Sequence, residues 1–180
     1  MTTTRGVDAI RAARVADAIR EGARRLSDLR ALIYETHRQP DRRAEWSRAC
    51  EQFHRSYDRS AFPGGLRAGM ANLEAGDPSA RDAAITFLEV DPMFFRSGYI
   101  KEKIIRRIKH FDLAPREIDR VHSAILQVVR NRWCRELRSY RTLARRLSDP
   151  RLKSYLQHLA DGGDPEARKR AAWVLAGMEP

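Results

Sequence analysis

The sequence predicts an all-α protein built from helical hairpins packed side by side. Apolar residues recur at intervals of three, four and seven residues along nearly the whole chain, which is the spacing of one helix face. Runs with the alternating pattern of a strand are nearly absent. The chain has 180 residues, 42% of them hydrophobic, and this suffices for one compact unit with an apolar core.

The first sixty residues predict a pair of helices. Residues 7–37 and 41–57 each carry an apolar stripe, and Pro40 separates them because proline cannot continue a helix. Within the first segment, Ser27-Asp28 could cap a new helix. The stripes are Val15, Ile19, Leu26, Leu29 and Leu32 in the first segment and Trp46, Cys50, Phe53 and Tyr57 in the second. We therefore expect an N-terminal helical hairpin over residues 1–60.

A loop at residues 61–65 should follow this hairpin. It contains Phe62-Pro-Gly-Gly65, and a proline followed by two glycines is typical of a loop. We expect the loop to connect the hairpin to helical repeats over residues 66–180, with the whole chain forming one compact unit.

Four Asp-Pro dipeptides predict helix starts. An aspartate at the N-cap accepts a backbone N–H, and a proline in the first turn lacks only a donor that would have no partner there. The dipeptides are Asp77-Pro78, Asp91-Pro92, Asp149-Pro150 and Asp164-Pro165. The first two are 14 residues apart and the last two 15, so each interval fits one short helix and a tight turn.

Two segments of the chain repeat one another. Gly76-Asp-Pro-Ser-Ala-Arg81 and Gly163-Asp-Pro-Glu-Ala-Arg168 share a pattern, and a common alanine and leucine follow each copy. The second copy resembles the second helix of a HEAT repeat: Asp164, Pro165, Arg168, Ala171, Ala172 and Leu175 match its pattern. The last 30 or so residues match best and residues 66–90 moderately. The resemblance implies a HEAT-like helical-hairpin array, α-solenoid-like, joined to the N-terminal pair.

Almost all of the excess positive charge lies in residues 96–146. This stretch holds fifteen Lys or Arg and five Asp or Glu, which gives it +10 of the formal net charge of +11. Charge concentrated in this way indicates a surface that meets a negative partner. We expect helices over residues 92–111 and 113–147, the second either broken near Asn131-Arg132 or unusually long, and most of these cations lie away from the apolar stripes. We expect the partner-binding residues to be Arg96, Lys103, Arg106, Arg107, Lys109, Arg135, Arg138 and Arg145.

The partner that this pattern favours is an acidic protein, because HEAT-like proteins mostly bind other proteins. The chain would then be a non-enzymatic binding or adaptor protein. The alternative is a DNA- or RNA-binding protein that uses the same basic face, with Tyr99 stacking on bases if it is exposed. Trp133 and Tyr140 lie on an apolar stripe, so we expect them in the core. A second alternative is a DNA glycosylase of HEAT-like type, whose catalytic aspartate matches no motif here.

We expect no catalytic residue, metal site or cofactor. Glu51-x-x-His54 and Asp119-x-x-His122 have di-iron spacing, but no carboxylates complete a ligand set. No nucleophile elbow or phosphate-binding loop occurs in the sequence. The absence of an apolar run near 18 residues and of an apolar leader leads us to expect no membrane span and a cytoplasmic location.

Overall fold

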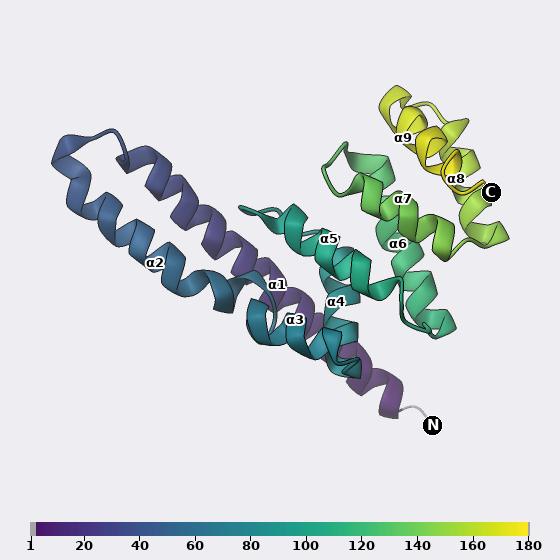
Figure 1. Cartoon of the computed structure of the whole chain (residues 1–180), viewed down its shortest axis with the longest axis horizontal. Helices are drawn as coiled ribbons and strands as arrows, with labels where there is room; N and C mark the ends of the chain where they lie inside the picture. Colours follow the sequence, from purple (N-terminus) through teal and green to yellow (C-terminus); the bar gives the residue numbers. More distant parts are fainter. Residues whose placement is uncertain (1–2, 180) are drawn as a thin grey trace. The chain divides into compact units, whose positions relative to one another are not determined.

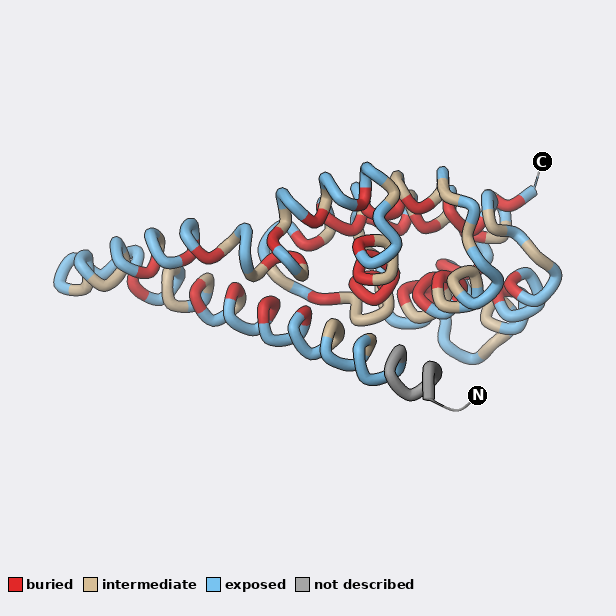
Figure 2. The backbone as a smooth tube through the Cα atoms, turned by 90° about the horizontal axis from the view of Figure 1, so that it is seen from below, coloured by how far each residue is buried: buried red, intermediate tan, exposed pale blue. Residues whose placement is uncertain are grey.

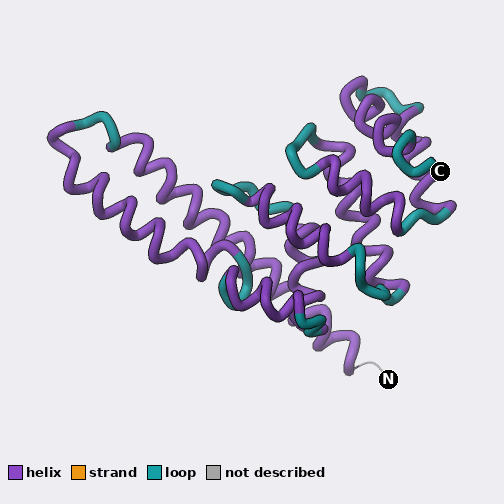
Figure 3. Tube along the Cα trace, in the orientation of Figure 1, coloured by secondary structure: helices purple, strands orange, loops and turns teal. Residues whose placement is uncertain are grey.

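The computed structural model describes residues 3–179 and confirms the all-α fold (Figure 1). Within these residues the chain contains helices, loops and turns and no strand (Figure 3). The helices are α1 (Thr3–Thr36), α2 (Arg43–Ala61), α3 (Leu66–Glu74), α4 (Pro78–Val90), α5 (Ser97–Ile108), α6 (Pro115–Asn131), α7 (Leu137–Arg146), α8 (Pro150–Ala160) and α9 (Pro165–Leu175), with a 3₁₀ turn at Pro40–Arg42. None of the helices in the described part of the chain is long and apolar enough to cross a bilayer.

The chain divides into two compact units, Met1–Ser97 and Gly98–Pro180. The first contains α1–α4 and the second almost all of α5 together with α6–α9. The loop expected at residues 61–65 lies inside the first unit, where Phe62–Gly65 joins α2 to α3. Phe62 is buried there and packs against Phe87. The division of the chain at this loop stays a prediction.

In the first unit, α1 packs against α2 and α4. The possible break at Ser27-Asp28 is wrong, because α1 is continuous from Thr3 to Thr36. Leu26 and Leu29 on either side of the pair are both buried, so the apolar stripe holds the helix together across it. Figure 2 shows buried positions recurring along α1 and α2. The two helices approach closely, since a Cβ on Gly22 would lie 2.2 Å from the carbonyl oxygen of Ser60.

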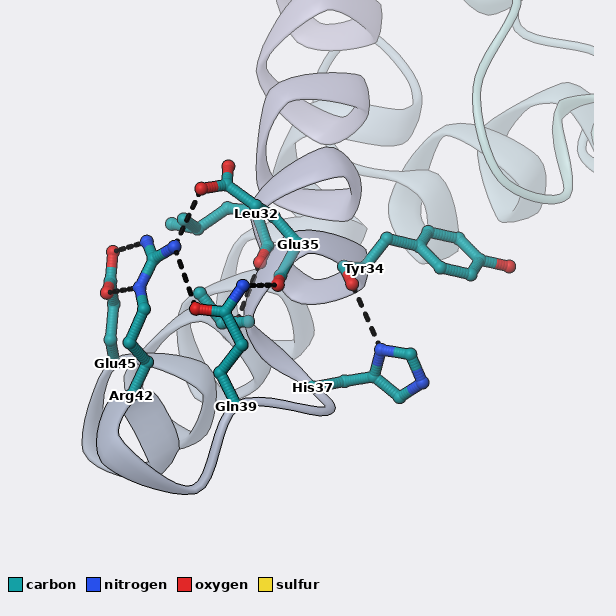
Figure 4. Close-up of polar contacts among 8 residues, drawn as sticks. Leu32, Tyr34, Glu35, His37, Gln39, Arg42 and Glu45 are labelled. Carbon is teal, nitrogen blue, oxygen red and sulfur yellow. Dashed lines mark hydrogen bonds and ion pairs between the residues drawn. The ribbon is translucent and has the colours of Figure 1, made fainter.

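Polar contacts fix the tip of the α1–α2 hairpin, as Figure 4 shows. Arg42 donates to both carboxylate oxygens of Glu45, at 2.7 and 2.9 Å, and to Glu35 at 2.7 Å. These hydrogen bonds raise the pKa of the Arg42 guanidinium above its ordinary value. Gln39 donates to the carbonyl of Glu35 and so satisfies an acceptor at the end of α1. Helix α1 ends at Thr36 and Pro40 begins the 3₁₀ turn, so Pro40 lies between the two helices, as predicted.

Three of the four Asp-Pro dipeptides start helices, as predicted. Asp77, Asp149 and Asp164 cap α4, α8 and α9, and each side chain accepts backbone N–H groups of the first turn. The prediction for Asp91-Pro92 is wrong. Asp91 ends α4 in a left-handed conformation with φ of 49°, and its N–H bonds to Phe87. Pro92 cannot continue the helix, and α5 begins only at Ser97.

In the second unit, the break expected near Asn131 is confirmed, because α6 ends at that residue. Arg170 of α9 is buried and donates from Nε to the carbonyl of Val129 and from Nη2 to that of Arg130, both at 2.6 Å. Its guanidinium therefore satisfies acceptors in the last turn of α6. His122 of α6 makes a 2.9 Å hydrogen bond through Nε2 to the carbonyl of Leu147, which follows α7.

Candidate functional site: a cationic surface on α5 and α7

Helix α5 separates its apolar and charged residues onto different sides. Ile100, Ile104 and Ile108 are buried at intervals of four. Lys103 and Arg106 are exposed. At about 100° per residue these two cations fall away from the isoleucine stripe, so packing of the stripe turns them to solvent.

Helix α7 repeats this arrangement. Leu137, Tyr140 and Leu143 are buried, which confirms the core position expected for Tyr140. Arg138 and Arg145 are exposed and lie seven residues apart, two turns along the same side of the helix. Helices α5 and α7 thus each carry exposed cations on the side away from their buried residues.

A buried ion pair joins α5 to the start of α7. The Nζ atom of Lys101, which is 0% exposed, lies 3.4 Å from Oε1 of Glu136, and Arg132 donates to the same oxygen at 3.1 Å. Burial on its own raises the pKa of the Glu136 carboxyl, but a backbone hydrogen bond and the charges of Lys101 and Arg132 bring it below its ordinary value. Glu136 is therefore a charged acceptor that ties the N-terminal ends of the two helices together.

Arg135 adds a second connection at the same place. Its Nε donates to Glu102 of α5 at 3.2 Å. Its guanidinium carbon lies 3.9 Å from the centre of the Tyr99 ring. A stacked and paired guanidinium is held in one orientation. Because both contacts are to residues of α5, Arg135 connects α5 to the residues just before α7.

The four exposed cations have no carboxylate partner among the residues that the structure describes. Lys103, Arg106, Arg138 and Arg145 make no ion pair there. Three of the carboxylates in residues 96–146 bind other cations: Glu102 pairs with Arg135, Glu136 with Lys101 and Arg132, and Asp119 with Arg151. Glu117 accepts the N–H of Ala114 at the start of α6. Lys103 and Arg106 of α5 and Arg138 and Arg145 of α7 therefore keep their positive charge, and we refer to these four exposed residues as the cationic surface.

The other predicted binding residues have different surroundings. Arg107 and Lys109 are half-buried at the end of α5. Arg96 belongs to the first unit, where its guanidinium lies 5.2 Å from the ring centre of Phe95. Four of the predicted residues are thus exposed on α5 and α7 without an ion pair among the described residues, and the other four have different surroundings.

Trp133 corrects one expectation, because it is 50% exposed and not part of the core. It lies in the loop between α6 and α7, where its indole N–H donates to Glu166 at 2.9 Å. Its ring meets that of Trp173 edge-on at 6.4 Å between centres. The helical stripe that placed it in the core begins only with α7, at Leu137.

Lys101 is the residue that the sequence analysis missed. Its sequence signal is its spacing of four and seven residues from Ile105 and Ile108, both buried, which puts it on the apolar side of α5. The stacking of Arg135 on Tyr99 has no such signal, because the two residues are 36 positions apart in the sequence.

The residues with metal-like spacing have other contacts. Glu51 pairs with Arg55, and the His54 ring packs edge-on against Phe53. Asp119 pairs with Arg151, and His122 bonds to a backbone carbonyl. In the described part of the chain, no three His, Cys, Asp or Glu side chains gather as a metal site would require.

The fold and this surface define an all-α protein that presents cations on two helices of its second unit. Comparisons with protein-family models, with curated proteins and with solved structures found no match.

Proposed function

We propose that this chain is a non-enzymatic binding or adaptor protein whose cationic surface binds an acidic protein. The observation that carries the proposal is that Lys103, Arg106, Arg138 and Arg145 are exposed and make no ion pair among the described residues. Like charges held together repel one another and weaken folding unless a partner offsets them. An acidic partner would supply the carboxylates that the second unit itself does not.

The proposal includes a HEAT-like scaffold and a cytoplasmic location. Helices α8 and α9 pack as a hairpin, and Asp164 caps α9 at the start of the matching motif. Ala167 and Ala171 of this motif are buried, so these small side chains allow close helix packing. Stacked helical hairpins present rows of side chains from successive helices to a partner.

The spacing of the cations suits carboxylates on a protein helix. Arg138 and Arg145 are about 10 Å apart along α7, given a rise of about 1.5 Å per residue. Acidic residues seven apart on a partner helix repeat at the same distance. The guanidinium fork of arginine binds a carboxylate through two hydrogen bonds, which adds orientation to the attraction of charge.

Affinity capture from the native cell tests this function. The full chain would be compared with a variant that carries Lys103→Glu, Arg106→Glu, Arg138→Glu and Arg145→Glu. The control is Arg25→Glu with Arg48→Glu, which reverses exposed charges in the first unit. We expect a protein partner that survives nuclease treatment, and whose affinity, measured with the purified partner, falls on the order of 100-fold in the fourfold variant only. Equal losses in both variants would contradict the proposal.

The second candidate function is nucleic-acid binding by the same surface. The observation that favours it is that Tyr99 and Trp133 are both about half exposed in the second unit. Aromatic side chains beside cations bind single strands by stacking on bases. Two results would identify the partner as nucleic acid and not an acidic protein. The captured partner would be lost on nuclease treatment, and the chain would bind single-stranded DNA with an affinity that falls steeply with salt.

A further inference from the structure

The first unit carries a different exposed cluster, in which arginines stack on aromatic rings. Arg30 of α1 lies 4.7 Å from the ring centre of Tyr34 and 4.3 Å from that of Phe95. Arg96 lies 5.2 Å from the same Phe95 ring. Tyr34 is 62% exposed, and Met93 beside this cluster in sequence is 60% exposed. The exposed Arg96 and the half-buried Arg30 thus accompany exposed apolar side chains in residues 93–96 and on α1.

The segment that carries Met93, Phe95 and Arg96 is fixed to the helices. The Ser27 hydroxyl of α1 donates to the carbonyl of Met93 at 3.2 Å, and the Tyr57 hydroxyl of α2 donates to the carbonyl of Phe95 at 3.1 Å. The Phe95 ring also packs against Phe53 of α2, with ring centres 6.1 Å apart. These contacts hold the exposed side chains on a defined backbone.

Arg96 occupies this position at a cost in backbone energy. Its φ is 67°, in the left-handed region that favours glycine. Non-glycine residues held in this region occur often at binding sites, because a required side chain justifies the strain. Here the side chain that the strained backbone presents is a cation over an aromatic ring.

Both guanidinium groups can still bind a carboxylate. Their N–H groups lie in the guanidinium plane, so a ring stacked on the flat face leaves these donors available. Arg30 uses one of them, at 3.1 Å from the Tyr34 hydroxyl. Neither Arg30 nor Arg96 forms an ion pair with a carboxylate among the described residues.

The same stacking argues against a nucleic-acid strand. A base needs an open aromatic face, and Arg30 and Arg96 already lie over the Phe95 ring. Met93 offers apolar contact without a flat face. The guanidinium groups of Arg30 and Arg96 need carboxylates as partners, and Met93 needs an apolar side chain. A protein segment can supply both.

We propose that Arg30, Arg96, Phe95, Tyr34 and Met93 form a docking site for a segment of another protein in which acidic and apolar residues alternate. In an extended segment, acidic residues two positions apart are about 7 Å apart and point to the same side. Both guanidinium carbons lie near one ring, so they can meet two such carboxylates. This site is independent of the cationic surface of the second unit.

The test measures fluorescence anisotropy of a labelled peptide of alternating glutamate and leucine. The protein is the full chain with glutamine in place of Lys103, Arg106, Arg138 and Arg145, so that binding to the second unit does not contribute. Two comparison peptides alternate glutamine with leucine and glutamate with serine, and the nucleic-acid probe is labelled oligothymidylate. We expect the glutamate–leucine peptide to bind at least tenfold more tightly than any other probe.

Variants of this chain locate the binding. Arg96→Gly removes the cation and the backbone strain together, so it keeps the fold, which thermal melting verifies. We expect Arg96→Gly and Arg30→Gln each to weaken binding of the peptide at least tenfold, and Arg25→Gln, an exposed cation of α1, to change it less than twofold. Failure of the peptide to bind, equal binding of a comparison peptide or of oligothymidylate, or equal effects of all three variants would overturn the proposal.

Discussion

Arg170 is a cation whose hydrogen-bond partners are backbone atoms of another helix, and its guanidinium also lies 3.8 Å from the Asp164 carboxylate. Carbonyls in the last turn of a helix lack intrahelical donors, and in α6 two of them, those of Val129 and Arg130, receive the Arg170 guanidinium. The contact links residues about 40 positions apart and fixes α9 against α6. A buried charged residue here stabilises the junction of two helices.

Removing this guanidinium should destabilise the protein strongly. We expect Arg170→Met to lower the free energy of unfolding by about 2–4 kcal/mol, because hydrogen bonds from a charged donor are lost and acceptors in the α6 terminus lose their partner. The control is Arg168→Met, an exposed residue of the same helix, which should change it by less than about 0.5 kcal/mol. Urea denaturation measures both, and equal effects would exclude the capping role.

Glu136 should make stability depend on pH. Its pKa is lowered in the folded protein, so its contribution is present above the unfolded pKa of about 4.3 and is lost as pH falls through the folded value. We expect Glu136→Gln to lower the free energy of unfolding by about 3 kcal/mol at pH 7, because the buried Lys101 loses its carboxylate. The difference from the parent should shrink below about pH 4.

The control for Glu136 is Glu102→Gln, which breaks the more exposed pair with Arg135. Glu102→Gln should lower the free energy of unfolding by less than about 1 kcal/mol, since exposed ion pairs contribute little to stability. Chemical denaturation at several pH values measures both variants. A deficit in Glu136→Gln that stays constant from pH 7 to pH 3 would show that its carboxylate charge does not stabilise the fold.

At the scale of single elements, aspartate caps determine where several helices begin. The Asp77 carboxylate accepts the N–H of Ala80 at 2.7 Å and so satisfies a donor that α4 cannot. We expect Asp77→Ala to lower the free energy of unfolding by about 1 kcal/mol and Asp77→Asn, which keeps an acceptor oxygen, to change it little. Thermal denaturation compares the two, and identical losses would show that the cap bond contributes nothing.

The helices and their caps were largely predictable from sequence, because they depend on neighbours within one or two turns. The length of the apolar pattern over residues 113–147 indicated a break between α6 and α7, with one long helix as the alternative, and the Asp-Pro dipeptides predicted three helix starts. The helix start predicted at Asp91-Pro92 was wrong, because the same dipeptide can end a helix when its aspartate adopts a left-handed conformation. The exposure of Trp133 was also not predictable, since the loop residues between α6 and α7 follow no helical period.

At the scale of the whole molecule, the dominant property is an uneven distribution of charge. The formal net charge is +11 and residues 96–146 hold most of it. Exposed cations that lack carboxylate partners repel one another, and salt at 0.1 M largely screens this repulsion between charges more than about 10 Å apart. Repulsion in the unbound protein should therefore weaken the fold most at low ionic strength.

We expect the melting temperature to rise by several degrees when sodium chloride is increased from 20 to 300 mM. Replacing Lys103, Arg106, Arg138 and Arg145 with glutamine should reduce this rise, because these cations contribute to the repulsion. Differential scanning calorimetry measures both proteins. A melting temperature that falls with salt would mean that the ion pairs outweigh the repulsion.

The candidate binding site was only partly predictable. The amphipathic pattern correctly predicted that four cations are exposed, because helix geometry alone decides which residues of a helix face away from its apolar stripe. These cations are Lys103, Arg106, Arg138 and Arg145. Contacts between distant residues decided the rest. The pair of Lys101 with Glu136 and the stack of Arg135 on Tyr99 each join α5 to the residues at the start of α7, which are more than 30 positions away in the sequence.

Gly98 lies against the buried ion pair, and a methyl group on its Cα would be 2.8 Å from Oε2 of Glu136. Even alanine would push this carboxylate away from its place beside Lys101. In natural variants of this protein, position 98 should stay glycine for as long as position 136 stays acidic. A substitution at position 98 should occur only together with a substitution at position 136, so the two positions should co-vary.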